Sequence, residues 1–195
     1  MTTDERYMKE AVRQAKKASA LGEVPIGCVI VYEDKIIARG YNRRMVDQNV
    51  LSHAEIIAIR KACKKMGDWR LENCTLYVTL EPCCHTGKQP PCTEAVLASG
   101  VKRVIVGCTD PNPVVAGRGI RLLREKGLEV VAGVLRGECE RQNEVFFHFM
   151  RTKLPFTVLK YAMTLDGKTA TVSGKSQWIT GEVARKCWLS ASTLY

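Results

Sequence analysis

The sequence has no long hydrophobic run and few aromatic residues. Aromatic side chains make up 7% of its 195 residues. No stretch comes near the ~18 to 20 consecutive apolar residues that a membrane-spanning helix needs. The chain opens with Met-Thr-Thr-Asp-Glu-Arg, which lacks the basic and then apolar pattern of a secretory signal. We therefore expect a soluble protein with no membrane partner.

The cysteines do not look like a disulfide framework. There are nine of them, an odd number, and they are scattered over the whole length of the chain. Free thiols persist in reducing compartments, whereas secreted domains of this size usually pair their cysteines. A cytoplasmic location is therefore expected.

The net charge of +10 is unevenly distributed. Residues 151–195 carry seven basic and two acidic side chains, which is half of the excess, whereas residues 81–150 carry nine and eight. A uniformly basic face would favour nucleic-acid binding through neutralisation of phosphates. Because the central part of the chain is nearly neutral, solvated Lys and Arg on helix surfaces are the favoured interpretation.

Hydrophobic periodicity predicts alternating strands and helices. The expected helices cover residues 4–21, 53–66, 91–100, 119–127 and 137–150, and the expected strands cover residues 26–31, 35–40, 75–80, 103–107 and 128–131. The first two strands form a hairpin, and the later ones are joined by helical crossovers, which place helices on both faces of a sheet. We therefore predict an α/β fold, a three-layer α/β/α sandwich that closes near residue 150.

The last part of the chain has a different amino-acid composition. Residues 156–162 are predicted to form a strand, and Gly167, Gly174 and Gly181 punctuate a stretch rich in Thr and Ser. A segment of this size cannot close a core alone. Residues 151–195 are therefore expected to be an incomplete extension of a first domain that spans residues 1–150.

The candidate metal ligands stand where predicted strands and helices meet. His53 opens one predicted helix, Cys83 follows a predicted strand, and Cys92 opens the next helix. Ligands of open α/β sheets usually bind at such junctions. One imidazole and two thiolates would give Zn²⁺ three protein ligands and leave the fourth tetrahedral position to water, which is the pattern of catalytic zinc.

Glu55 lies two residues after His53, where its carboxylate can reach zinc-bound water without binding the metal. We expect Glu55 to take a proton from that water, whose pKa zinc lowers to ~7, and to pass it to a leaving amine. This predicts hydrolytic deamination of an aminated nitrogen heterocycle. A fourth protein ligand, Cys84 or His85, would instead make the zinc structural, so a non-catalytic zinc-stabilised binding module is an alternative.

These residues resemble the His-x-Glu and Pro-Cys-x-x-Cys signature of the cytidine-deaminase superfamily. The short second half of the signature is absent, and the longer run from Glu81 to Cys92 is similar to bifunctional riboflavin-biosynthesis deaminase/reductases. That likeness continues to about residue 190 and is placed in the C-terminal two-thirds of the chain. It implies a cytidine-deaminase-like mixed sheet, a zinc-dependent deaminase over residues 1–150, and the start of a reductase domain over residues 151–195.

The first third of the chain resembles the tRNA-adenosine deaminases instead, in residues 22–27, 40–44 and 61–71. The riboflavin family holds its substrate with an Asn near the position of Glu23 and a His near that of Asn42, and both are missing here. Its His and Lys after the first zinc cysteine are present as His85 and Lys88. The resemblance implies four substrate contacts, with Lys88 meeting a phosphate: Asn42, Ala54, His85 and Lys88.

The two resemblances disagree about the substrate. We favour an aminopyrimidine ribotide of riboflavin biosynthesis, a small nucleotide-like molecule, because the ligand loop and the C-terminal half resemble that family. The alternative is adenosine or cytidine in tRNA or single-stranded nucleic acid. A flipped base needs an open basic rim, and its candidate residues are Arg43, Arg44, Lys64, Lys65 and Arg70.

The family likeness also implies Zn²⁺ as the cofactor and self-association into a homo-oligomer. A nicotinamide-dependent reductase would need a full domain of ~100 to 200 residues, so the last ~40 residues are not expected to catalyse reduction.

Overall fold

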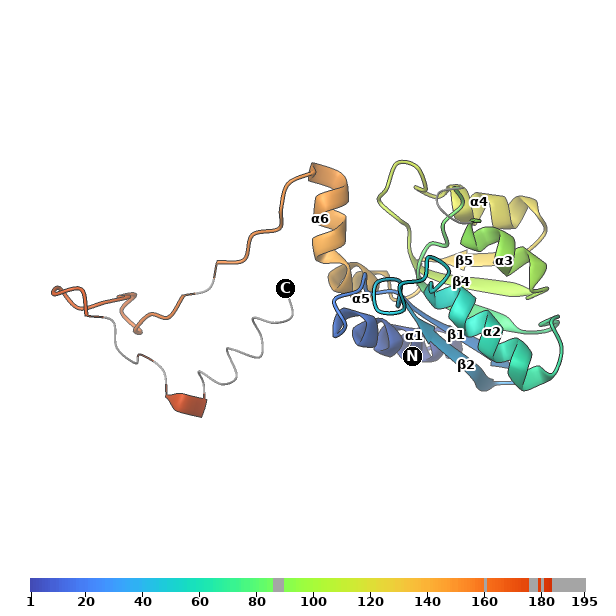
Figure 1. Cartoon of the computed structure of the whole chain (residues 1–195), viewed down its shortest axis with the longest axis horizontal. Helices are drawn as coiled ribbons and strands as arrows, with labels where there is room; N and C mark the ends of the chain where they lie inside the picture. Colours follow the sequence, from blue (N-terminus) through green and yellow to red (C-terminus); the bar gives the residue numbers. More distant parts are fainter. Residues whose placement is uncertain (86–89, 160, 176–178, 180, 184–195) are drawn as a thin grey trace. The chain divides into compact units, whose positions relative to one another are not determined.

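A computed structural model describes residues 1–85, 90–159, 161–175, 179 and 181–183 (Figure 1). The chain divides into two units, Met1–Leu154 and Pro155–Tyr195. The first unit contains the following elements in chain order: α1 (Thr3–Ser19), β1 (Gly27–Tyr32), β2 (Lys35–Tyr41), α2 (Ala54–Met66), β3 (Thr75–Leu80), α3 (Cys92–Ala98), β4 (Arg103–Cys108), α4 (Arg118–Glu125), β5 (Glu129–Ala132), α5 (Arg136–Gln142) and α6 (Glu144–Thr152).

The five strands form one mixed sheet in the order β2-β1-β3-β4-β5. The β1–β2 and β1–β3 pairs are antiparallel, whereas β3, β4 and β5 run parallel to one another. The tight hairpin connection makes β1 and β2 antiparallel, whereas the helical crossovers between β3, β4 and β5 allow these strands to run parallel. The predicted α/β class with a mixed sheet is therefore confirmed.

Helices cover both faces of the sheet and create two hydrophobic clusters. One cluster joins the sheet to α2, α3 and α4 through Ala58, Val96 and Leu123. The other joins it to α1, α5 and α6 through Met8, Cys139 and Phe147. Strand residues alternate between the clusters because successive side chains point to opposite faces. These are the three layers that the sequence predicts.

Gly40 lets α2 lie directly on β2. A Cβ atom at Gly40 would stand 2.1 Å from the carbonyl oxygen of Ala54, so any other residue would push the start of α2 away from the sheet. The helix ends at Gly67, whose φ of 73° is a left-handed conformation that glycine adopts without strain. The two glycines fix where α2 begins and ends.

Two of the predicted secondary-structure elements differ from the structure. The single helix predicted over residues 137–150 is broken into α5 and α6 at Asn143, which has φ −106° and ψ 18°. The side-chain amide of Asn143 donates to the carbonyl oxygens of Pro25 and Cys139. The strand predicted over residues 156–162 is also absent from the described part of that range. An isolated strand leaves its backbone groups unpaired, and the described residues of this unit include no strand that could pair with it.

The second unit contains two similar turns. The backbone N–H of Thr164 donates to the carbonyl oxygen of Lys168, and Thr171 donates in the same way to Lys175. Most of its described side chains are exposed, including apolar ones such as Leu165.

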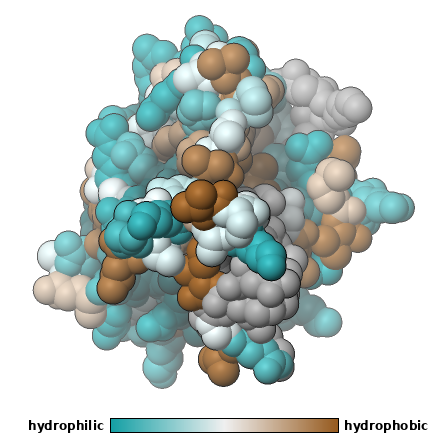
Figure 2. Space-filling view, turned by 90° about the vertical axis from the view of Figure 1, so that its left-hand side faces the viewer, coloured by the Kyte–Doolittle hydropathy of each residue, from teal (hydrophilic) through white to brown (hydrophobic). Residues whose placement is uncertain are grey.

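On the face of the chain drawn in Figure 2, hydrophobic and hydrophilic surfaces are interspersed. Within the described ranges, no helix is long and apolar enough to cross a lipid bilayer.

Candidate metal centre

Three side chains meet at the edge of the sheet where β3 and β4 end. His53 is the N-cap of α2, Cys83 lies in the loop after β3, and Cys92 is the first residue of α3. Their ligand atoms all lie within 4.8 Å of one another. The Nδ1 atom of His53 is 3.1 Å from the Cys92 Sγ atom, and the backbone N–H of Cys92 donates to the Cys83 Sγ atom at 3.3 Å.

This spacing fits a tetrahedral zinc ion. Zn–S bonds of ~2.3 Å and Zn–N bonds of ~2.0 to 2.1 Å place the ligand atoms of such an ion about 3.5 to 3.8 Å apart. One imidazole and two thiols also form a donor set that binds zinc in preference to magnesium or calcium, because the latter two ions favour oxygen ligands. Among the described residues, the group contains neither Cys84 nor His85, the fourth ligands that a structural site could recruit.

The thiol of Cys83 is poised to lose its proton. The hydrogen bond from Cys92 lowers the pKa of Cys83 to about 4, with a further contribution from His53, although burial opposes the shift. The pKa of Cys92 is raised for the converse reason, because its thiol donates to Cys83 and is buried. The lowered pKa of Cys83 favours its thiolate, which is the form in which cysteine binds a metal.

The carboxyl group of Glu55 is buried beside these ligands. It is 4% exposed and lies in the first turn of α2. Burial raises the pKa of Glu55 to about 7; the positive charge of His53 opposes this shift and the negative charge of Cys83 adds to it. A carboxyl group with a pKa near neutrality can both accept and return a proton at physiological pH.

A second buried carboxylate, that of Glu23, organises the loop before α2. Its Oε1 atom accepts the backbone N–H groups of Met45 and Val46 at 2.6 and 3.0 Å, and its Oε2 atom accepts the Asn42 side-chain amide at 3.2 Å. The N–H of Arg43 donates to the carbonyl oxygen of Ser52, the residue before His53. Asn42 is thereby held in the loop that leads to the metal centre.

The other expected substrate contacts differ in their setting. The Ala54 side chain is completely buried in the core, which leaves its backbone for a contact with a ligand. His85 is exposed. Lys88 lies outside the described residues.

Glu81 is a buried residue next to the candidate ligands, and the sequence analysis assigns it no role beyond its place in the motif before Cys83. Its Oε2 atom accepts the backbone N–H groups of Asp110 and Gly117 at 3.2 and 2.9 Å, and its Oε1 atom accepts that of Ile120 at 3.1 Å. The sequence does contain a signal for this role, because a carboxylate stands directly after a strand of mostly apolar residues. A charge buried there needs several hydrogen-bond partners.

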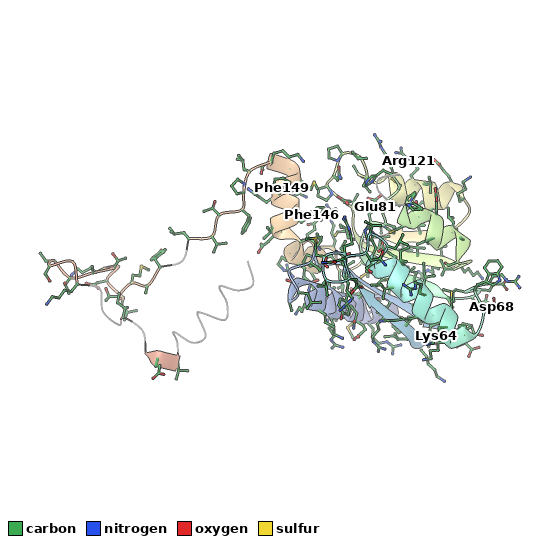
Figure 3. All side chains as sticks on the ribbon, viewed as in Figure 1. Lys64, Asp68, Glu81, Arg121, Phe146 and Phe149 are labelled. Atoms are coloured by element: carbon green, nitrogen blue, oxygen red, sulfur yellow. The ribbon has the colours of Figure 1, made fainter. Side chains whose placement is uncertain are left out.

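The basic side chains that the nucleic-acid alternative would need do not gather at one end of α2. Lys64 and Lys65 lie in the last turn of α2, whereas His53 precedes its first turn, and a helix of 13 residues is about 20 Å long. Figure 3 shows Lys64 and Asp68 at the end of α2 that points away from Glu81. Arg43 belongs to the loop before α2 and is ion-paired with Asp47 at 2.8 Å. The basic side chains are therefore divided between the two ends of the helix.

Two family models match the chain. Residues 1–108 match the cytidine and deoxycytidylate deaminase zinc-binding region. Residues 155–188 match the RibD C-terminal domain.

Individual proteins match over most of the chain. The riboflavin biosynthesis protein RibD of Actinobacillus pleuropneumoniae is 47% identical over 185 residues, which are 94% of this chain and 47% of that protein. The tRNA-specific adenosine deaminase of Bacillus subtilis is 48% identical over 157 residues, which are 78% of this chain and 94% of that protein. The chain thus spans about half the length of the RibD proteins that it matches. Because each likeness covers most of the chain, the comparisons do not confirm the expected division into a first third and a remaining two-thirds.

A solved structure has the same fold. It is the crystal structure of a diaminohydroxyphosphoribosylaminopyrimidine deaminase/5-amino-6-(5-phosphoribosylamino)uracil reductase from Thermotoga maritima, with a TM-score of 0.83 and 43% sequence identity. The match covers 96% of this chain and 52% of that one. A fold of the cytidine-deaminase type is therefore confirmed.

Proposed function

The chain belongs to the family that carries the cytidine and deoxycytidylate deaminase zinc-binding region, and we propose that its residues 1–150 form a zinc-dependent hydrolytic deaminase. The substrate that we propose is an aminopyrimidine ribotide of riboflavin biosynthesis. The observation that carries the proposal is the convergence of His53, Cys83 and Cys92 beside the buried carboxyl group of Glu55. Residues 151–195 are proposed to be an incomplete extension that resembles the start of a reductase domain.

The reaction follows from the positions of these groups. His53, Cys83 and Cys92 would hold Zn²⁺. The ion would supply a Lewis acid that lowers the pKa of water enough for the nucleophilic hydroxide to form near pH 7. Glu55 accepts the proton that the attacking water loses and delivers it to the departing amine. The aminated ring carbon gains an oxygen and loses ammonia, so one water molecule is consumed for each ammonia released. A pKa of about 7 suits Glu55 to both proton transfers.

The names of the relatives support the riboflavin-pathway substrate. RibD proteins match 92–95% of this chain at 40–47% identity, and the Thermotoga maritima structure is named for an aminopyrimidine deaminase. We propose Asn42, Ala54, His85 and Lys88 as the residues that contact this substrate. Self-association into a homo-oligomer is proposed on the family likeness alone.

A second candidate is deamination of adenosine or cytidine in tRNA or in another single strand. It is favoured by the 48% identity to a tRNA-specific adenosine deaminase, nearly the whole length of which is matched. The division of the basic side chains between the two ends of α2 counts against it, because a nucleic acid is held by a continuous basic surface.

A substrate panel tests the proposal. The zinc-loaded chain is assayed for ammonia release from the diaminopyrimidine ribotide, cytidine, adenosine, guanine and a tRNA anticodon stem-loop. We expect turnover of the ribotide, and loss of that turnover with unchanged zinc content in Glu55→Ala. Turnover of the stem-loop with steep salt dependence would establish the second candidate. If no substrate releases ammonia although zinc is stoichiometric, the chain is a zinc-stabilised binding module and the proposal is wrong.

A further inference from the structure

The carboxylate of Glu81 connects two loops that are distant in the sequence. Its three hydrogen-bond donors belong to residues 110, 117 and 120, and so to one segment that includes the start of α4. The backbone N–H of Glu81 donates to the carbonyl oxygen of Cys108 at 2.9 Å, which continues the β3–β4 pairing to the end of both strands. Glu81 therefore holds the segment after β4 against the end of β3.

The same two backbones touch directly. A Cβ atom at Gly119 would stand 2.3 Å from the carbonyl oxygen of Pro82 and 3.2 Å from the Oε1 atom of Glu81. Pro82 immediately precedes Cys83. The backbone that carries this candidate ligand thus contacts both the start of α4 and α3, where the N–H of Thr93 donates to the Cys83 carbonyl oxygen.

Backbone dipoles, and not a cation, balance the charge of Glu81. It is 3% exposed, and the ion pairs found among the described residues do not include it. Three N–H donors, two of them at the N-terminus of α4, stabilise a carboxylate through charge-assisted hydrogen bonds. Because these donors are backbone groups, the carboxylate stays bound only while the whole segment keeps its position.

We propose that Glu81 is a positioning residue of the metal centre. By anchoring residues 110–120 to the backbone next to Cys83, it keeps the Cys83 sulfur atom in reach of His53 and Cys92. The proposal rests on the proposed function only in taking these three side chains as zinc ligands. Partners that orient metal ligands typically contribute 10- to 100-fold to metal affinity.

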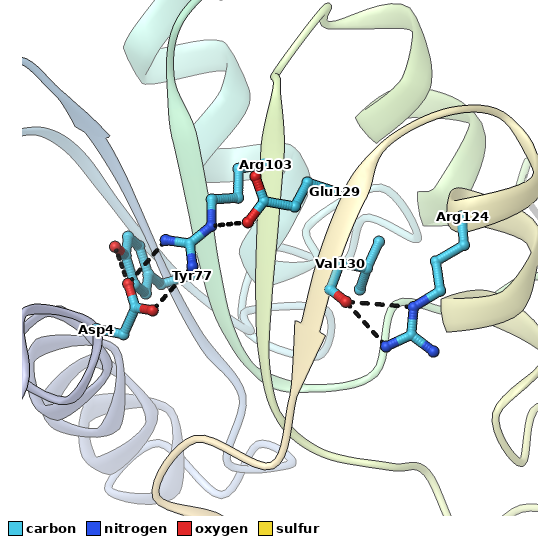
Figure 4. Close-up of polar contacts among 6 residues, drawn as sticks. All are labelled: Asp4, Tyr77, Arg103, Arg124, Glu129 and Val130. Atoms are coloured by element: carbon cyan, nitrogen blue, oxygen red, sulfur yellow. Dashed lines mark hydrogen bonds and ion pairs between the residues drawn. The ribbon is translucent and has the colours of Figure 1, made fainter.

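The test compares two isosteric substitutions at opposite ends of β3 and β4. Glu81→Gln turns one acceptor oxygen into an amide that faces an N–H group. Asp4→Asn makes the same change in a carboxylate that accepts from Arg103 and Tyr77 at the start of these strands (Figure 4). Both full-length variants are loaded with zinc, and zinc transfer to a colorimetric chelator is followed together with the melting temperature.

We expect Glu81→Gln to release zinc at least about tenfold faster than the wild type, and Asp4→Asn to release it at the wild-type rate. The charge-transfer absorption of the Co²⁺-loaded Glu81→Gln variant should also change, because it reports on the two thiolate ligands. Equal zinc release from both variants, with a lower melting temperature alone, would show that Glu81 is merely structural. Neither readout uses a substrate, so both stay valid if the proposed reaction is wrong.

A second pair of variants covers the case in which Glu81→Gln does not fold. Gly119→Ala would wedge α4 away from Pro82, whereas Gly127→Ala adds the same methyl group where no atom lies within 4 Å. The control carries the strain of a positive φ of 89° but no collision, and it lies after α4, away from the donors to Glu81. Faster zinc release from Gly119→Ala than from Gly127→Ala supports the proposal, and equal rates overturn it.

Discussion

The two ends of the parallel strands hold their charges in different ways. Where β3 and β4 begin, the Arg103 guanidinium bonds the carboxylates of Asp4 and Glu129 at 3.0 and 2.6 Å, and all three side chains are 23–60% exposed. Where β3 ends, Glu81 is buried and bonded to backbone groups alone. Exposed ion pairs contribute ~0 to 1 kcal/mol and tolerate changes. A buried carboxylate that loses its partners is strongly destabilising, so the end that carries the proposed metal ligands tolerates fewer substitutions.

The largest effect should come from removing the metal. With His53, Cys83 and Cys92 as the proposed zinc ligands of the folded chain, free zinc at 1,000 times its dissociation constant should stabilise the fold by about 4 kcal/mol. Dialysis against a chelator should therefore lower the melting temperature, and hydrogen exchange should accelerate around His53, Cys83 and Cys92. Exchange at Arg103 and Glu129 should change little. Uniform acceleration along the chain would contradict the distinction between the two ends.

Truncation of the two carboxylates should give the next largest difference. Glu81→Ala leaves three N–H groups near the core without an acceptor, at about 1 to 3 kcal/mol each, so the free energy of unfolding should fall by more than about 3 kcal/mol. Asp4→Ala should lower it by about 1 kcal/mol, because water can replace most of its hydrogen bonds. Urea denaturation of both variants measures the two values. Similar losses would show that burial does not separate the two ends.

The smallest effect concerns Glu10, which joins α1 to β2 through an ion pair with Arg39 at 2.9 Å. Burial raises the pKa of Glu10, but the hydrogen bonds from Arg39, Arg13 and Gln14 outweigh it and leave the pKa below its usual value. A lowered pKa in the folded state stabilises the fold above the unfolded value of 4.5, and this contribution disappears as the pH falls through the folded pKa.

Glu10→Gln should therefore be less stable than the wild type by about 0.2 to 1 kcal/mol at pH 7. The difference should shrink below about pH 4.5 and vanish in stronger acid. Urea denaturation across this pH range measures it, and 1 M salt should abolish most of it by screening. A difference that persists unchanged in acid would assign the stability to packing of the side chain and not to its charge.

Much of the fold could be predicted because its signals are local. The apolar spacing of α1 and the alternation of the strands are visible within short windows, and so is the placement of His53, Cys83 and Cys92 at the element boundaries. Whether these three side chains bind zinc stays a prediction.

The remaining features depend on contacts between distant residues. Glu81 finds its partners 29 to 39 positions later, and no short window contains both. The break at Asn143 depends on the carbonyl oxygen of Pro25, 118 residues earlier. The basic side chains are divided for a geometric reason, because Arg43 precedes α2 whereas Lys64 lies in its last turn, a full helix length away.

The anchor that we propose for Glu81 would also order events during synthesis. Cys92 leaves the ribosome ahead of Ile120, whose backbone N–H bonds Glu81, so a nascent chain would expose the imidazole and both thiols while the strand end that carries Cys83 is still free to move. Secure retention of an ion would begin only when β4 has paired with β3 and the following turn has closed. A cell short of zinc would then hold a pool of finished but empty chains, already shaped to accept the ion.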